Sequence, residues 1–417
     1  AGVAAGAPAR LGPASAAVLP FENLSGVKGD EYFSDGMSDT LLDRLSQVPQ
    51  LRIAARTSSF AFKGKSASAA EIGAALGVAA LVEGSVQRQG DELRIGAELI
   101  RVADGTRVWS KQYDRKAKDL FAIQDEIAAA VTQELVGRLL PSSKAALARR
   151  GTNDLQAYQD YIQGHQAMTR VSLDSLQHAE KLLQSAVARD PNYTAALLDL
   201  VQCWGGEYNA GAFGPDEFLR RATPVLDRVE VTDPGNARVL ALRGYLAQAR
   251  GDYELARTLI TRAVALAPDD YGIRIIAADF AAMTGDVEAE LVHVDRMIAL
   301  DPLNPLGFGQ RATSLVPLGR LDEAETSARR ALKLDPGNLV GMTAMAWAAL
   351  ARHDLAGGMA WMLKIYGSNI DPSAAVDIAM GLDSLQEYGA ADAWMAESRR
   401  VQPQDNLYAD QYDVQRL

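Results

Sequence analysis

Cysteine, long apolar runs and metal-binding motifs are features that this 417-residue chain lacks. Its one cysteine, Cys203, excludes an internal disulfide and a cysteine-based zinc cluster. No apolar run approaches the roughly 18 residues that a membrane-spanning helix needs. The four histidines are widely separated and none has zinc-motif spacing: His165, His178, His293 and His353. The sequence therefore predicts no metal site. It leaves the compartment open, since a periplasmic protein need not contain disulfides.

Catalytic and nucleotide-binding motifs are missing as well. Gly64-Lys65-Ser66 resembles the end of a phosphate-binding loop, but Ser59 stands where that motif needs a glycine. No GxSxG nucleophile elbow is present. Cys203 lies in an apolar run that is typical of a small buried side chain. We therefore expect no enzyme, no cofactor and no catalytic residue.

Basic residues are fewer than acidic ones, and the difference is not the same in all parts of the chain. The chain has 42 Lys and Arg against 53 Asp and Glu, a net charge of -11 that disfavours nucleic acid as a partner. Residues 1–150 carry 19 basic and 17 acidic side chains, whereas residues 151–417 carry 23 and 36. The acidity thus belongs to the second part of the chain, and a membrane headgroup contact stays open for the first.

Alternating strand and helix patterns mark the first part of the chain. Residues 1–16 are rich in Ala, Gly and Pro and predict a linker or stalk. Apolar spacing in residues 17–150 predicts these strands and helices: strands at 17–20, 51–57, 80–88, 92–102 and 107–114, and helices at 35–48, 68–76 and 119–139, the last ending before Pro141. This order predicts an α/β domain with helices packed on a mixed sheet.

A repeat appears after residue 150. Pro234, Pro268, Pro302 and Pro336 are each 34 residues apart, and several of the prolines in this region follow an aspartate. Small residues recur where paired helices would meet, and glycines recur where the first helix of a pair would end. This period is typical of the tetratricopeptide repeat, a helix-turn-helix unit.

Residues 151–417 are therefore expected to form an all-α tetratricopeptide-repeat solenoid of about seven units. The unit at 194–234 is nine residues longer than the others, and its excess is predicted to form a loop at 205–215. The last two units, roughly 339–370 and 373–403, are degenerate, as terminal repeats often are.

Four stretches of the first domain carry a family resemblance. They are AVLPFENLSG (17–26), EYFSDGMSDTLLDRLSQVPQLRIAARTSSFAFKGK (31–65), IGAALGVAALVEGSVQRQGDELRIGAELIRVADGTRVWSKQYDR (72–115) and LFAIQDEIAAAV (120–131). Through them, residues 17–140 resemble the TolB-amino-terminal-like (FlgO-like) domain of bacterial adenylate cyclases, winged-helix transcriptional regulators and some Ser/Thr kinases. In those proteins tetratricopeptide repeats typically follow this domain. The resemblance implies a periplasmic, non-catalytic sensory or docking region, and it supplies no catalytic residues.

The repeat array offers the candidate binding surface. In this repeat the first helix of each unit lines a concave groove, where counting from each repeat start places Asp199, Gln202, Arg238, Tyr245, Gln248, Asp279, Gln310, Thr313 and Trp347. Aromatic and polar side chains together suit an extended peptide or a protein loop. An alternative of equal weight is that Tyr245 and Trp347 only pack between helices and bind no partner. Because Arg238 is the one basic member, an internal segment fits better than a free carboxyl terminus.

These observations predict the periplasmic sensory and protein-interaction region of a membrane-anchored bacterial signalling protein. Its partner would be a protein or peptide in the groove, whose binding would be relayed through the α/β domain and the stalk. A homodimer stays open, and membrane attachment would come from a segment upstream of Ala1. The alternative is a soluble or lipid-tethered envelope assembly factor with no output module. The gene sequence upstream of Ala1 would discriminate the two.

Overall fold

The computed structural model describes residues 14–26, 31–48, 51–137, 151–168, 173–367, 374–384 and 386–401. Most of the predicted linker at 1–16, and the end of the last predicted repeat, therefore lie outside the described residues. Contacts divide the chain into two compact units. The first comprises Ala1–Phe280 with Leu300–Pro302, and the second comprises Ala281–Ala299 with Leu303–Leu417.

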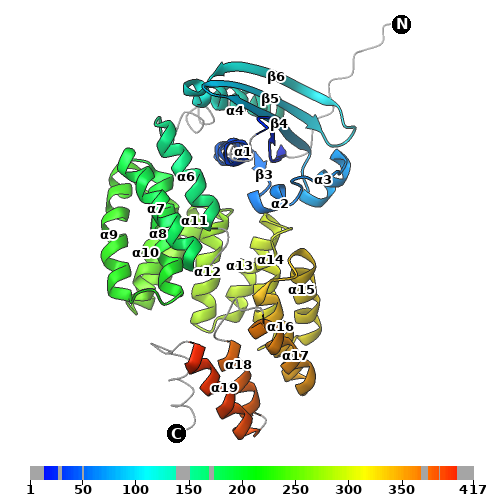
Figure 1. Cartoon of the computed structure of the whole chain (residues 1–417), viewed down its shortest axis with the longest axis vertical. Helices are drawn as coiled ribbons and strands as arrows, with labels where there is room; N and C mark the ends of the chain where they lie inside the picture. The colour runs from blue at the N-terminus through cyan, green and yellow to red at the C-terminus, as the bar shows by residue number, and fades with distance from the viewer. Residues whose placement is uncertain are drawn as a thin grey trace. The chain divides into compact units, whose positions relative to one another are not determined.

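A mixed sheet begins the first unit (Figure 1). In the described part of the chain it has six strands: β1 (Ser15–Val18), β2 (Glu22–Asn23), β3 (Arg52–Ile53), β4 (Ala80–Gln89), β5 (Glu92–Arg101) and β6 (Arg107–Lys116). The strand order is β3-β1-β4-β5-β6, and β2 also pairs with β4. β1 runs parallel to β3 and β4, whereas β4, β5 and β6 form antiparallel hairpins. Gly90 and Gly105 supply the positive φ angles of the hairpin turns.

The helices of this domain are α1 (Glu31–Ser46), α2 (Arg56–Phe60), α3 (Ala69–Leu76), the short η2 (Ala117–Asp119) and α4 (Leu120–Val136). Apolar side chains of α1 and α4, such as Met37, Leu41 and Ile127, are buried in one core with the strands. Ser68 and Glu71 form a capping box at the start of α3, and Gly77 ends the helix with a φ of 64°. This confirms the expected helix at 68–76.

Several boundaries differ from the prediction, and the helix expected at 35–48 is α1, which already begins at Glu31 and ends at Ser46. β1 begins at Ser15, inside the stretch predicted as a linker, because the backbone there pairs with β3 even though small side chains provide no hydrophobic signal. The expected strand at 51–57 is only two residues long, because α2 begins at Arg56. The helix expected to reach Pro141 ends at Val136, where Gly137 adopts a left-handed φ of 83°. β2 and α2 had no clear sequence signal because both are very short.

An array of helices follows. In the described part of the chain there are two for each predicted repeat: α6 (Leu155–Met168), α7 (Leu173–Arg189), α8 (Thr194–Asn209), α9 (Pro215–Thr232), α10 (Ala237–Ala249), α11 (Tyr253–Leu266), α12 (Tyr271–Met283), α13 (Val287–Leu300), α14 (Pro305–Leu315), α15 (Leu321–Leu334), α16 (Leu339–Ala351), α17 (Leu355–Gly367), α18 (Ala374–Ser384) and α19 (Tyr388–Val401). The predicted fold class, an α/β domain followed by an all-α repeat array, is confirmed.

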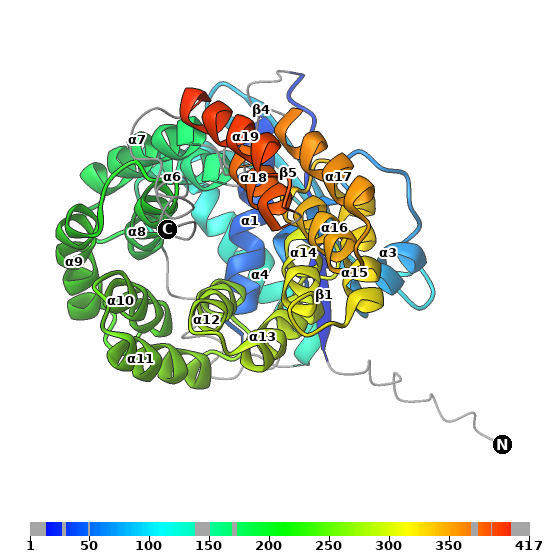
Figure 2. The ribbon, with the colours of Figure 1, turned by 90° about the horizontal axis from the view of Figure 1, so that it is seen from below.

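Small residues allow the paired helices to pack closely. A Cβ atom on Gly164 would lie 2.9 Å from Leu183, and one on Gly244 would lie 2.6 Å from Ile260. Figure 2 shows α8 and α10 on the inner side of the arc that these helices form, and α9 and α11 on the outer side. The first helix of each of these pairs therefore lines the concave face, as the repeat pattern predicts.

The long repeat at 194–234 uses most of its extra residues to lengthen its helices. The loop predicted at 205–215 is present but shorter, because α8 continues to Asn209 and α9 begins at Pro215, which leaves residues 210–214 between them. Gly205 leaves room for the Tyr245 ring, which would lie 2.8 Å from a Cβ atom at this position. Tyr208 stacks on Phe218 with ring centroids 5.3 Å apart. This aromatic packing holds the glycine-containing segment in a helix.

Candidate protein-interaction site

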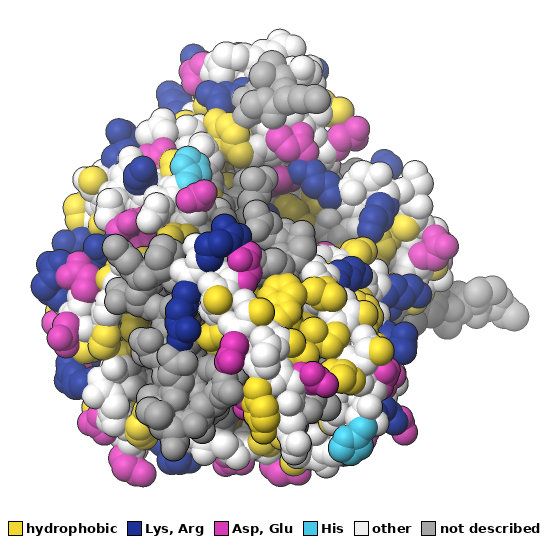
Figure 3. All heavy atoms as spheres, turned by 60° about the horizontal axis from the view of Figure 1, so that its bottom comes forward, with side chains coloured by type: hydrophobic (Ala, Val, Ile, Leu, Met, Phe, Trp, Pro, Cys, Tyr) yellow, Lys and Arg dark blue, Asp and Glu magenta, His cyan; other side chains and the backbone are white. Residues whose placement is uncertain are grey.

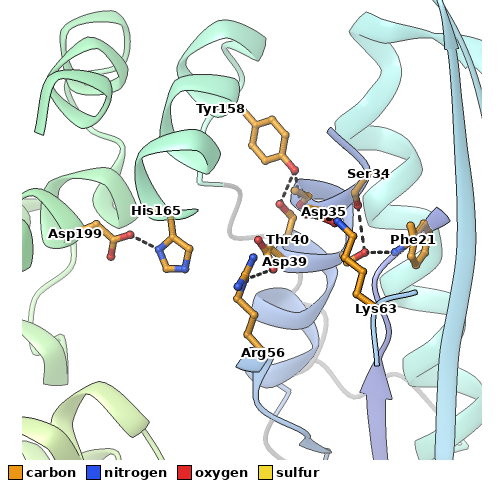
Figure 4. A network of polar contacts seen from close by, with 12 residues as sticks. Phe21, Ser34, Asp35, Asp39, Thr40, Arg56, Lys63, Tyr158, His165 and Asp199 are labelled. Atoms are coloured by element: carbon orange, nitrogen blue, oxygen red, sulfur yellow. Dashed lines mark hydrogen bonds and ion pairs between the residues drawn. The ribbon is translucent and has the colours of Figure 1, made fainter. Parts of the chain in front are cut away.

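The site begins with a row of four carboxylates on α1. Glu31, Asp35, Asp39 and Asp43 are each four residues apart and therefore lie on one side of the helix. Lys63 Nζ lies 2.6 Å from both Glu31 Oε1 and Asp35 Oδ1, and Arg56 Nε lies 2.6 Å from Asp39 Oδ1 (Figure 4). Asp43, the last of the row, makes no hydrogen bond or ion pair in the described part of the chain. Two cations thus pair with the first three carboxylates, and Asp43 has none among the described residues.

A histidine–aspartate pair of the array faces this row. The His165 ring on α6 lies with its Nδ1 atom 2.6 Å from Oδ2 of Asp199 on α8, and Asp199 is only 3% exposed. Burial by itself would lower the pKa of His165, but the charge and hydrogen bond of Asp199 raise it to about 9. The imidazole is therefore positively charged at neutral pH. Figure 4 shows this pair on the array side and Asp39 with Arg56 on the α1 side.

Arg238 on α10 completes the charged group. Its Nε atom donates to Asp270 Oδ2 at 2.8 Å, and about half of the guanidinium side chain is exposed. Burial opposes its charge, but Asp270 holds the pKa of Arg238 above its usual range. Asp270 also accepts a hydrogen bond from the backbone N–H of Ile273 at 3.0 Å, so the start of α12 fixes this carboxylate.

We refer to Asp39, Asp43, His165, Asp199 and Arg238 as the junction site. Their charges act on one another: both His165 and Arg238 oppose the effect of burial, which raises the pKa of Asp43 to about 6. Solvent nevertheless reaches part of Asp43, His165 and Arg238. The junction site is therefore an accessible polar surface that the surrounding protein partly desolvates.

A tyrosine holds α1 against the array. The Tyr158 hydroxyl on α6 donates to the Gly36 carbonyl at 2.7 Å, lies 2.7 Å from Thr40 Oγ1 and accepts from Gln124 Nε2 at 3.2 Å. A Cβ atom on Gly36 would lie 2.8 Å from Ile162, so glycine is needed for α1 and α6 to approach this closely. The first repeat and the α/β domain consequently share one core.

A second contact within the first unit involves the aspartate of an Asp-Pro pair. Asp301 is buried, and its carboxylate accepts a hydrogen bond from the backbone N–H of Ser58 in α2 at 2.9 Å. Negative charge at this position suits the first turn of a helix, where backbone N–H groups have no helical partner.

The nine residues predicted for the groove fall into two groups by unit. In the first unit, Asp199 and Arg238 belong to the junction site, and Gln202 and Asp279 are exposed. Tyr245 packs on Phe218 and donates to Asn209 Oδ1 at 2.6 Å, which agrees with the alternative that it packs between helices. Gln248, on the same helix, is half-buried.

The other three predicted groove residues belong to the second unit. Gln310 and Thr313 lie half-buried on α14, and Thr313 Oγ1 bonds to a carbonyl of its own helix. Trp347 on α16 is 40% exposed, so its ring does not pack fully between helices. Binding by any of these nine residues stays a prediction.

Sequence reasoning did not identify Asp39, Asp43 or Arg56 as site residues, and it considered His165 only as a possible metal ligand. The spacing of Asp35, Asp39 and Asp43 was a readable signal for one helical face. Nothing in the sequence indicated that this face would meet the array.

Several other groups have plain structural roles. Cys203 is buried, its thiol donates to the Leu176 carbonyl at 3.1 Å, and burial raises its pKa to about 12, which disfavours the reactive thiolate. Within the described ranges, no group of three or more His, Cys, Asp or Glu side chains is arranged to hold a metal ion. The helices of these ranges are also too short or too polar to cross a membrane.

Surface charge is mixed. Figure 3 shows acidic and basic side chains interspersed over the face that it presents, with hydrophobic side chains gathered in one area. Four large apolar side chains on the helices from α16 to α19 are more than one-third exposed: Trp347, Leu363, Met380 and Tyr388.

Comparison with protein families identifies the repeat. Residues 241–305 and 308–338 both match tetratricopeptide repeat models. The second half of the chain contains tetratricopeptide repeats. These matched segments run from within α10 to the end of α15, where the spacing of prolines is most regular. Such repeats are built to present a concave surface for binding other molecules, and they indicate a protein-interaction region.

Two kinds of regulatory protein are distantly related to this chain. A putative adenylate cyclase 3 from Rhizobium meliloti (strain 1021) is 34% identical over 200 residues, which are 46% of this chain and 34% of that protein. The transcriptional regulator HilA from Salmonella typhimurium is 25% identical over 150 residues, 36% of this chain and 27% of HilA. The chain thus spans about a third or less of the length of these relatives.

Among solved structures, the human IFIT1 dimer with m7Gppp-AAAA resembles this chain with a TM-score of 0.52. The match covers 69% of this chain and 70% of IFIT1, with 12% sequence identity. At that identity the likeness concerns the helical fold alone.

Proposed function

We propose that this chain is the non-catalytic sensory and protein-interaction region of a membrane-anchored bacterial signalling protein, located in the periplasm. The tetratricopeptide repeats support an interaction role. The two regulatory relatives support a place in signalling, with an output module, such as a cyclase or a transcription-regulating domain, outside this chain. The periplasmic location follows from the resemblance of residues 17–140 to the TolB-amino-terminal-like domain.

The junction site is the observation that carries this proposal. Solvent reaches Asp43 and Arg238 of this site, and the neighbouring groove residues Gln202 and Asp279 are exposed as well. A protein segment in the groove can therefore reach charged and polar groups there. Because α1 contributes to the same surface, occupation of the groove would be felt directly by the α/β domain. That contact offers a route from the ligand to the rest of the signalling protein.

Site-specific photocrosslinking in the full-length protein tests binding at the groove. A photoreactive amino acid at Gln202, on the inner helix α8, should capture a discrete protein in the bacterium that produces this chain. The matched control carries it at Glu254, which is exposed on the outer helix α11. Reversing the charge of Arg238 (R238E) should weaken capture from position 202. Equal capture from both positions, or none from position 202, would contradict the groove as the binding surface.

Reporter fusions test the location. β-Lactamase fused to the carboxyl terminus of the full-length protein should confer ampicillin resistance, because that enzyme protects cells only from the periplasm. A fluorescent-protein fusion that folds only in the cytoplasm should stay dark. The reverse pattern would overturn the periplasmic part of the proposal and leave the groove experiment unaffected.

A further inference from the structure

The carboxylate row of α1 is a ladder of acidic side chains whose last member has no cation among the described residues. Lys63 pairs with both Glu31 and Asp35, and Arg56 pairs with Asp39 one helical turn later. Asp43 continues the row by another turn, toward His165 and Arg238 of the array, but no side chain of the described residues forms an ion pair with it. The local fold therefore supplies cations for the first three carboxylates of the row and none for Asp43.

The charges around Asp43 are already matched with one another. His165 pairs with Asp199, and Arg238 pairs with Asp270, each at hydrogen-bonding distance. Both cations influence Asp43 only through space. Counting each ion pair as neutral leaves the junction site with one uncompensated negative charge, at Asp43. A positively charged ligand group would remove this imbalance, whereas an acidic one would add to it.

A second, independent feature points to the same kind of ligand. Asp39 is 4% exposed, and only its Oδ1 atom has a partner, the Nε atom of Arg56. The Oδ2 atom is buried without a hydrogen-bond donor in the described part of the chain. An ionised carboxylate oxygen without a donor is costly inside a protein. Figure 4 shows Asp39 on the side of α1 that faces His165, so a donor entering there could serve Asp39 as well as Asp43.

From this arrangement we infer that the segment bound in the groove presents a lysine or arginine side chain to Asp43, at the junction between α1 and the repeat array. This rests on the proposed function and specifies the chemistry of its partner. An arginine fits best, because its planar group of donors can contact Asp43 and the free oxygen of Asp39 together. The basic side chain becomes the third cation of the ladder, so binding joins α1 to the groove.

Peptide libraries of defined charge test the inference on the whole chain. The probes are fluorescein-labelled peptides with blocked termini, one central position held as Arg, Lys, Gln or Glu, and uncharged residues elsewhere. Fluorescence anisotropy at about pH 8, where Asp43 with its pKa of about 6 is ionised, measures their affinity. The Arg and Lys libraries should bind about fivefold more tightly than the Gln library, and the Glu library should bind most weakly.

Variants assign this preference to one carboxylate. D43N should abolish the preference for Arg and Lys, and D43E should retain it. E254Q, which removes a carboxylate from the outer helix α11, should behave like the unmodified protein. Circular dichroism shows whether each variant is folded. Peptide binding with no preference for basic residues, or a preference that survives in D43N, would overturn this inference but leave the groove as a binding surface. Failure of every library to bind would overturn both.

Discussion

Two parts of the face that α1 turns to the array differ in what surrounds them. At one, Gly36 and Thr40 close on α6, where the Tyr158 ring is buried and its hydroxyl makes hydrogen bonds to the backbone and to side chains. At the other, Asp39 and Asp43 lie near charged residues of the array, and solvent reaches Asp43. The first part is dry and close-packed, whereas the second is ionic and open.

The difference separates positioning from recognition. A close-packed contact loses both hydrophobic free energy and hydrogen bonds when a large side chain is removed, so it holds α1 in place. An exposed charge contributes little to stability and is available for binding. Four measurements can break or sharpen this comparison.

Truncating Tyr158 should have the largest effect. Y158A removes a buried ring together with its hydroxyl, so the free energy of unfolding should fall by about 3–5 kcal/mol, measured by urea denaturation. Hydrogen exchange should speed up in α1 and α6. Y253A, which truncates an exposed tyrosine on α11, is the matched control and should cost less than about 1 kcal/mol. If the two variants lost similar stability, α1 and α6 would not be joined as described.

Neutralising Asp39 should have the second largest effect on stability. D39N removes the charge that pairs with Arg56 inside the protein and should lower the free energy of unfolding by about 2 kcal/mol. The reason is that the Arg56 guanidinium, only 24% exposed, would lose its counterion. Adding R56Q to D39N should recover part of the loss, because both charges are then absent. R56Q should therefore cost less free energy of unfolding in the D39N background than in the unmodified chain. An equal cost in both backgrounds would indicate that the two side chains do not interact.

A pH dependence should follow from His165. Its pKa is about 9 in the folded chain and about 6.5 in an unfolded one, so its stabilisation is complete below about pH 6.5 and is lost as the pH rises through 9. Because solvent reaches part of the imidazole, the expected loss is about 1 kcal/mol. Urea denaturation on either side of this range measures it. H165Q should lack this component, whereas H178Q, at an exposed position on α7, should keep it.

Neutralising Asp43 should have the smallest effect on stability. D43N should leave the free energy of unfolding unchanged or raise it by up to about 0.5 kcal/mol, since it removes no ion pair or hydrogen bond of the described residues and takes away a charge that burial disfavours. Differential scanning calorimetry of D43N and D39N under the same conditions compares the stability effects of the two carboxylates, which are one helical turn apart. Destabilisation of D43N as large as that of D39N would mean that Asp43 is a structural residue and not an open one.

Much of the fold could be read from local patterns. The 34-residue spacing of prolines predicted the repeat, and Ser68, Glu71 and Gly77 predicted the limits of α3. The loop predicted at 205–215 from the length of its repeat shows where such patterns fail. Only residues 210–214 connect the helices, because Gly205 and Gly206 pack against Tyr245 and Leu176 within α8.

The candidate site could be predicted only in part. Asp199 and Arg238 were placed on the concave face because they stand on the first helices of their repeats, a matter of counting along the chain. Their partners on α1 could not be found in this way. Tyr158 and Gly36 are 122 residues apart, and no periodic pattern connects them.

Periodicity therefore established the elements of this protein, the kind of repeat and the helix faces that line a groove, because a single segment carries a hydrophobic period of its own. The tertiary structure alone decided that α1 meets the array, that His165 and Asp199 face Asp39, and that no cation of the described residues pairs with Asp43. Those features depend on how distant surfaces fit, through the missing side chain of Gly36 and the buried ring of Tyr158. Such complementarity has no signature in either segment taken separately.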